Sequence, residues 1–258
     1  MPAGGRGIFL WLLLLVVPLG AHAGAWPQAP GATQVIASYE PGQSSQAFDA
    51  SGHTSSLSGW RQSDAMLFID HGISPHFTVT AKLDLQDYKT PVSHFSGVGA
   101  LAIGGRWTVT RGPTSVFAVG ASVIGGEGRH NDFDRRNGGT DYEVRAYAGR
   151  SFQLSGNPAF IDLQAARYLR QDEASQWRFD ATLGVHTLSR WMVLAQAFGG
   201  QTDREAWGRS SWVNSQLSVV RGMGPKQDVS LQLGVRETTS GHNVPMTRVL
   251  VVGLWKTF

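Results

Sequence analysis

The chain contains no cysteine, few charged residues and only one long apolar run. The absence of cysteine excludes disulfides, thiolate metal sites and the acylated cysteine of a lipoprotein. Charged residues make up 16% of the chain, below the quarter that is usual for soluble domains. The net charge of +3 comes from basic residues interleaved with acids, which gives no basic patch and excludes nucleic acid as a partner.

The apolar run lies at the start of the chain, from Ile8 to Val17. It is too short for a membrane-spanning helix, which needs about 20 residues. The small residues Ala21 and Ala23 follow it in the pattern of a signal-peptidase cleavage site. We therefore predict that residues 1–23 are a signal peptide for Sec-dependent export and that the mature domain spans 24–258. An uncleaved anchor is the alternative.

The mature chain alternates apolar and polar residues with a period of two, which is typical of β-strands and excludes amphipathic helices. The pattern is clearest in 77–86, 177–186 and 229–236. Turn residues separate twelve such runs. They are predicted near 33–39, 62–70, 76–86, 95–109, 114–124, 141–153, 159–169, 176–187, 191–199, 212–221, 227–236 and 246–258.

The links between these runs are sorted by length. Links after even-numbered strands are short and rich in Gly, Pro and Ser, whereas links after odd-numbered strands tend to be longer. The two longest are predicted at Glu40–Arg61 and Gly125–Thr140. Short periplasmic turns and longer outer loops are typical of outer-membrane barrels, and both termini would then lie in the periplasm.

The last run has the features of a strand that closes a barrel. Leu250, Val252, Leu254 and Phe258 occupy alternate positions, and only Lys256 departs from this apolar set. A hydrophobic strand at the edge of an open sheet would be exposed, and closure of the sheet removes that edge. This strand resembles the closing strand of outer-membrane barrels, which the barrel-assembly machinery reads.

The polar face of the strands is predicted to line the interior. Charges facing lipid cost about 2–4 kcal/mol each near the midplane, so they should point inward. The predicted pore-lining residues are Lys82, Asp84, Arg106, Glu143, Arg145, Asp162, Arg178, Asp180, His186, Asp228 and Arg236. Both signs of charge are present, which argues against strong anion or cation selectivity.

Two local patterns are compatible with functions other than transport, namely hydrolysis and metal binding. His94 and Ser96 lie two apart on one strand face and resemble the His-aromatic-Ser-Asn motif of outer-membrane lipid A deacylases, but Gly97 replaces the Asn. The segment 127–136 clusters acids with arginines, and its spacing fits no calcium loop. We expect no metal or cofactor, and we expect Arg135 and Arg136 in that segment to contact lipopolysaccharide.

Five segments carry a family resemblance: SGVGALAIGGRW from Ser96, DYEVRAYAGRSFQ, NPAFIDLQAARYLR, WRFDATLGVHT and WMVLAQAF. They resemble a group of proteobacterial outer-membrane β-barrel proteins akin to the transporters of aromatic (phenol meta-pathway) degradation. The resemblance implies an outer-membrane barrel, implies uptake, and supplies no catalytic residue.

The sequence thus predicts an all-β protein, a transmembrane antiparallel up-and-down β-barrel of about twelve strands in the outer membrane of a Gram-negative bacterium. The expected function is passive passage of a small-molecule solute through a narrow lumen of mixed charge, with outer-membrane lipid and lipopolysaccharide as surroundings. The alternatives are a structural barrel without a pore, a lipid hydrolase that uses His94 and Ser96, and a soluble secreted β-sandwich.

Overall fold

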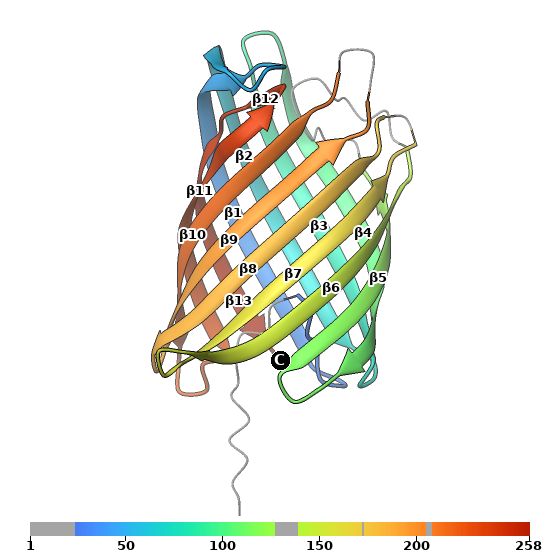
Figure 1. The fold of residues 1–258 in the computed structure, drawn as a ribbon, viewed down its shortest axis with the longest axis vertical. Coiled ribbons are helices and arrows are strands. Elements are labelled where there is room, and N and C mark those ends of the chain that lie inside the picture. The colour runs from blue at the N-terminus through green and yellow to red at the C-terminus, as the bar shows by residue number, and fades with distance from the viewer. Residues whose placement is uncertain (1–23, 127–138, 172, 205–207) are drawn as a thin grey trace, which may run out of the picture.

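A computed structural model describes residues 24–126, 139–171, 173–204 and 208–258 of the chain. Its regular structure is antiparallel β-strand (Figure 1). The described part of the chain contains no helix that is long and apolar enough to cross a membrane. The strands are β1 (Thr33–Phe48), β2 (Thr54–Gly72), β3 (Phe77–Lys89), β4 (His94–Arg111), β5 (Ser115–Gly125), β6 (Asp141–Leu154), β7 (Asn157–Leu169), β8 (Gln176–Leu188), β9 (Trp191–Thr202), β10 (Ser211–Met223), β11 (Val229–His242), β12 (Val244–Pro245) and β13 (Arg248–Thr257).

From β1 to β11 each strand pairs with the next, and β11 pairs with β13. The ring closes at β1, which pairs with β2 on one side and with β12 and β13 on the other. Because β12 and β13 are two pieces of one final strand, twelve strands surround the interior. The predicted closing strand therefore closes the barrel, and no strand edge is left unpaired.

The break between β12 and β13 has a local cause. Pro245 has no N–H to donate to the ladder, and the register of β1 shifts between Ser44 and Gln46 at the same level. The Ser44 hydroxyl lies 2.6 Å from the Gln46 carbonyl oxygen and 2.7 Å from that of Met246, and so it links the two strands at the break.

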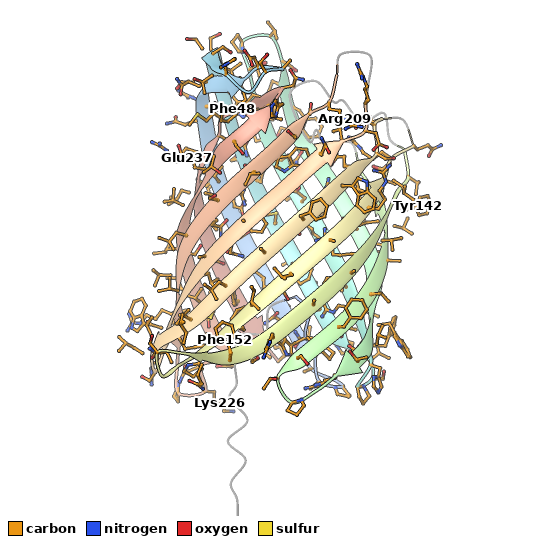
Figure 2. The ribbon with its side chains drawn as sticks, viewed as in Figure 1. Phe48, Tyr142, Phe152, Arg209, Lys226 and Glu237 are labelled. Atoms are coloured by element: carbon orange, nitrogen blue, oxygen red, sulfur yellow. The ribbon has the colours of Figure 1, made fainter. Side chains whose placement is uncertain are left out.

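The wall has the polarity of a membrane barrel. Leu233, Val235 and Leu250 are half exposed on the outer face, whereas Gln232 on the inner face is buried. An inverted arrangement of this kind fits a surface in contact with lipid and a polar interior. Tyr142 and Phe152 project outward near opposite ends of β6, as aromatic girdles at the two membrane interfaces would (Figure 2). The predicted fold class is confirmed.

The two ends of the barrel differ. One end carries the C-terminus and the tight links 73–76, 112–114, 155–156, 189–190 and 224–228, and we call it the short-turn end (Figure 1). The other, the long-loop end, carries most of the longer connections. The predicted loop Glu40–Arg61 is wrong, since β1 continues to Phe48 and the turn spans only 49–53. The predicted loop 125–140 lies mainly outside the described residues.

Candidate functional site: the barrel interior

The interior receives most of the charges that the alternation assigned to it. Asp228 differs, because it lies in the turn before β11 at the short-turn end, where the Lys256 ammonium donates to its carboxylate. The other predicted pore-lining residues occupy positions that alternate with exposed apolar ones and point inward: Lys82, Asp84, Arg106, Glu143, Arg145, Asp162, Arg178, Asp180, His186 and Arg236.

Arg145 is the centre of a charged cluster on β6, β7 and β8. Its Nε lies 2.8 Å from Glu143 Oε1 and its Nη2 lies 3.1 Å from Glu143 Oε2, so the pair is bidentate. Its Nη1 also donates to Gln164 Oε1 at 2.8 Å and to the Asp180 carboxylate. A planar guanidinium suits this geometry, because its five N–H groups reach several acceptors at once.

Arg178 lies next to this cluster and is held differently. Its guanidinium carbon lies 4.2 Å from the centroid of the Tyr168 ring, and its Nε and Nη2 lie 3.2 and 3.1 Å from Gln176 Oε1. Among the described residues it makes no ion pair with a carboxylate. The π face of Tyr168 and one amide oxygen therefore stabilise this cation.

The wall formed by β1, β2 and β3 is acidic. Glu40 lies directly opposite Asp64 in the register, and Asp84 follows on β3. Arg236 from β11 donates to Glu40. Lys82 points into the same space, is exposed and makes no ion pair within the described part of the chain. An exposed ammonium inside the barrel means that this part of the interior is open to water.

An uncharged sector completes the ring. Gln216 Nε2 lies 2.9 Å from Gln196 Oε1 and 3.0 Å from the Ser218 hydroxyl. Gln232 Nε2 donates to the same hydroxyl at 3.1 Å, and Gln232 Oε1 accepts a hydrogen bond from Trp255 Nε1 at 3.1 Å. This ladder on β9, β10, β11 and β13 gives the interior amide and hydroxyl groups that can bind polar neutral molecules.

Residues 24–32, which precede β1, lie inside the barrel toward the short-turn end, and we call them the N-terminal segment (Figure 1). Ala25 is fully buried, and its backbone N–H donates to Asp162 Oδ2 at 2.6 Å. The Gln28 N–H donates to Thr78 Oγ1 at 3.3 Å. The segment is thus bound to β3 and β7 by hydrogen bonds to side chains of the inner wall.

Trp26 of the N-terminal segment packs against the inner wall of the barrel. Its ring packs edge-on against Phe160, with centroids 6.0 Å apart. A Cβ on Gly149 would lie 2.6 Å from the Trp26 ring, so the wall is hollowed to admit the indole. Similarly, a Cβ on Gly72 would lie 2.2 Å from the Ala29 carbonyl oxygen. These contacts depend on tertiary fit, and no local sequence pattern indicates them.

A buried ion pair anchors the segment on its other side. Arg106 Nη2 lies 2.8 Å from Asp70 Oδ2, and both side chains are almost fully buried. The same Nη2 donates to the Trp26 carbonyl oxygen at 3.1 Å. Sequence reasoning identified Arg106 but missed Asp70 and Asp64, because the inward-facing Met66 and Phe68 on β2 hide the polar alternation.

Apolar side chains also reach the interior near each end. Phe160, Met192, Leu194 and Val220 form one cluster, against which Trp26 packs. Ala100, Ile124 and Tyr168 form a second cluster toward the long-loop end. The charged and amide groups therefore share the interior with two clusters of apolar side chains.

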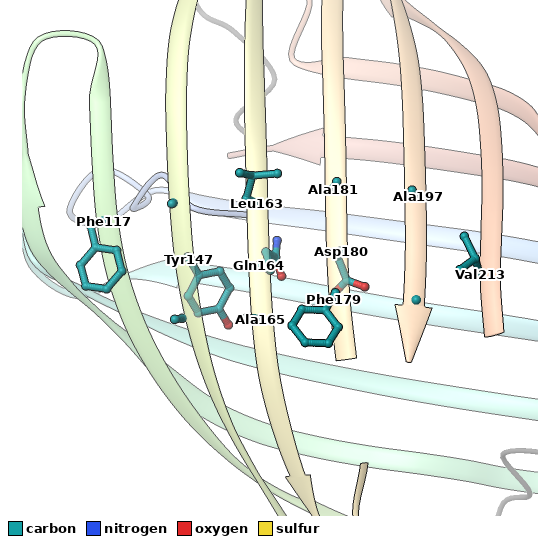
Figure 3. A pocket seen from close by; sticks show the side chains of 13 residues that line it. Phe117, Tyr147, Leu163, Gln164, Ala165, Phe179, Asp180, Ala181, Ala197 and Val213 are labelled. Carbon is teal, nitrogen blue, oxygen red and sulfur yellow. The ribbon is translucent and has the colours of Figure 1, made fainter. Parts of the chain in front are cut away.

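The wall formed by β5 to β10 carries a hollow of about 520 Å³ (Figure 3). Its rim is formed by Phe117, Leu163, Phe179 and Val213, all of which are exposed on the outer face. Its floor consists of small residues, including Ala146, Ala148, Ala165, Ala181 and Ala197. Tyr147, Gln164 and Asp180, which belong to the inner wall, also line the hollow.

The predicted hydrolase pair lies on the outer face of β4. His94 Nε2 is 3.2 Å from Asp87 Oδ2, and both side chains are exposed. The described hydrogen bonds include none between His94 and Ser96, so the nucleophile–base contact that hydrolysis requires is not formed. No group of three or more His, Asp or Glu among the described residues is placed to hold a metal ion. Arg135 and Arg136 lie outside the described residues.

Comparison with solved structures identifies the class of barrel. The COG4313 outer membrane channel from Pseudomonas putida F1 matches with a TM-score of 0.71 and 14% identity, over 93% of this chain and 100% of that one. The KdgM porin in complex with disordered oligogalacturonate (TM-score 0.53, 8% identity, 87% and 99% covered) and the NanC porin (0.53, 9%, 84% and 98%) are also similar.

No protein-family model matches the chain, and no curated protein sequence matches it. At these identities the structural similarity establishes the fold alone. The chain is therefore a closed β-barrel with the fold of outer-membrane channels and porins.

Proposed function

We propose that this protein is a channel for small polar molecules in the outer membrane of a Gram-negative bacterium, reached after Sec-dependent export. The observation that carries the proposal is Lys82, an unpaired and solvent-exposed ammonium on the inner wall. A barrel closed by packing would bury or pair such a charge, because an isolated buried ammonium is costly. The short-turn end, which carries the C-terminus and the start of β1, would face the periplasm.

The chemistry of the wall suggests which solutes pass. Acids on β1 to β3 face an interior that also contains Arg145 and Arg178, while the opposite sector is formed by amides. Such a wall provides partners for both ends of a zwitterion and for polar neutral molecules. The resemblance to barrels of aromatic degradation makes small aromatic acids the first solutes to test.

Single-channel conductance of the refolded mature chain in planar lipid bilayers tests the proposal. A heat-modifiable shift on unboiled gels shows first that the barrel has folded. We expect small discrete steps whose cation preference rises in Lys82→Glu. Lys226→Glu, in the turn between β10 and β11, is the matched control and should leave the preference unchanged. A folded barrel that conducts nothing, both intact and without the N-terminal segment, would refute the channel.

A further inference from the structure

Asp162 is a buried carboxylate that lacks a cationic partner among the described residues. Only 2% of its surface is exposed. Its oxygens accept hydrogen bonds from the Ala25 backbone N–H at 2.6 Å and from Gln164 Nε2 at 2.8 Å. Two neutral donors compensate a buried charge incompletely, and an isolated buried carboxylate is strongly unfavourable.

The charged groups around Asp162 are already engaged. Arg106 pairs with Asp70 at 2.8 Å, and Arg145 binds Glu143 and Asp180. These two cations are therefore already paired with other carboxylates. The N-terminal segment, which is bound against Asp162, is a further source of positive charge.

The nitrogen of Gly24 is placed to supply that charge. One residue spans at most about 3.6 Å, so the Gly24 nitrogen lies within about 6 Å of the Asp162 oxygen that contacts Ala25. Opposite charges interact strongly over this distance in a buried setting. A Cβ on residue 24 would lie 2.6 Å from Gln164 Nε2, so glycine allows the backbone to approach this close.

We propose that the α-ammonium of Gly24, released by cleavage after Ala23, is the counter-ion of Asp162 and fixes the N-terminal segment inside the barrel. Hydrolysis of the Ala23–Gly24 peptide bond by a signal peptidase consumes one water. It leaves a carboxylate on Ala23 and an amine on Gly24, which is protonated at neutral pH. In the uncleaved chain the same nitrogen is a neutral amide. Removal of the signal peptide thus controls how firmly the segment binds.

This inference rests on the proposed cleavage site and deepens the proposed channel, because the segment occupies the passage. The chain has no cysteine, so Gln28→Cys, in the N-terminal segment, provides a single thiol. Gln28 is buried when the segment is bound. The rate at which a membrane-impermeant maleimide labels this thiol reports release of the segment and does not depend on conductance.

Four forms of the Gln28→Cys chain are compared: the chain starting at Gly24, the same chain extended by Ala-Ala, Asp162→Asn, and the extended Asp162→Asn chain. Mass spectrometry first establishes that the exported chain starts at Gly24. We expect the extension and Asp162→Asn each to raise the labelling rate about tenfold, with no further increase in combination. Asp84→Asn, six residues beyond Thr78 on β3, is the control and should label at the parent rate.

Two results would overturn the proposal. One is a mature chain that starts elsewhere. The other is an extended chain that labels as slowly as the parent while Asp162→Asn labels faster, because Asp162 would then act through the Ala25 N–H alone. A conducting barrel with unchanged labelling would refute the ion pair and leave the channel intact. A barrel that does not conduct, but in which the extension and Asp162→Asn raise the labelling rate without adding to each other, would refute the channel and leave the ion pair intact.

Discussion

Each buried charge of the inner wall depends on its partner. Arg106→Leu leaves Asp70 buried without a counter-ion, and we expect it to lower the free energy of unfolding by about 3–5 kcal/mol. Urea titration of the refolded barrel, followed by the heat-modifiable gel shift, measures this change. The double variant Asp70→Leu/Arg106→Leu removes both charges and should recover most of the stability. A double variant as unstable as the single one would contradict this explanation.

An ion pair between Arg167, near the end of β7, and Asp203, which follows β9, gives a pH-dependent test. Arg167 donates to both carboxylate oxygens of Asp203, at 2.9 and 2.5 Å, and this hydrogen bonding holds the pKa of Asp203 below its ordinary value of 3.8. A lowered pKa in the folded state stabilises the protein above the unfolded value, and the effect is lost as the pH falls through the lowered pKa.

Asp203→Asn should therefore reduce stability at neutral pH, by about 0.2–1 kcal/mol because the pair is partly exposed. The difference from the parent should disappear as the pH falls below 3.8 through the lowered pKa. Urea midpoints from neutral pH downward measure it. A difference that stays constant across this range would show that the ion pair is not its cause.

Single residues also show where sequence reasoning ends. Lys256 interrupts the apolar face of the last strand, and the structure explains it: its ammonium binds Asp228 and lies 5.3 Å from the centroid of the Phe258 ring at the short-turn end. Such a pair joins two segments that are distant in sequence. Alternation identifies which face a residue occupies, but it does not identify its partner.

The N-terminal segment and the wall that holds it fit by shape. Gly149→Ala would place a Cβ about 2.6 Å from the Trp26 ring, so we expect it to release the segment and raise thiol labelling at Gln28→Cys several-fold. Trp26→Ala should also release it. If the two residues act through one contact, Gly149→Ala should add nothing to Trp26→Ala. If the two substitutions instead raise the labelling rate additively, Gly149→Ala does not act through its contact with Trp26.

The first hairpin shows why the sequence did not predict the full length of β1 and β2. β1 and β2 remain paired up to Phe48 and Thr54, in a stretch predicted as a loop. Serine is the commonest residue of this stretch and large apolar residues are few, so apolar alternation is absent although the backbone ladder continues. Hydrophobic periodicity reports a strand only where one of its faces meets an apolar phase. The central strands meet that condition, and their predicted positions agree with the structure.

The sequence predicts the fold class of the whole molecule, but it does not predict the segment that lies inside the barrel. Outward apolar residues, inward charges and a closing strand together specify a membrane barrel, and each is visible in the sequence. The segment inside the barrel is not, because its binding depends on Gly72, Gly149 and the Arg106–Asp70 pair meeting in three dimensions. A lead-in rich in Pro and Gly looks the same in sequence whether it lies in the periplasm or in the lumen.

The orientation of the whole molecule gives a decisive test of its environment. Leu233 is half exposed in the central part of β11 and faces outward. On a soluble protein an exposed Leu→Arg change would alter stability by at most about 0.5 kcal/mol. In a bilayer, Leu233→Arg should cost about 2–4 kcal/mol, because the guanidinium must enter hydrocarbon. Gln43→Arg, exposed toward the long-loop end, is the matched control and should cost little. Unfolding free energies measured in lipid vesicles decide between the soluble and the membrane-embedded protein. Equally small effects at both positions would show that the outer face does not contact hydrocarbon.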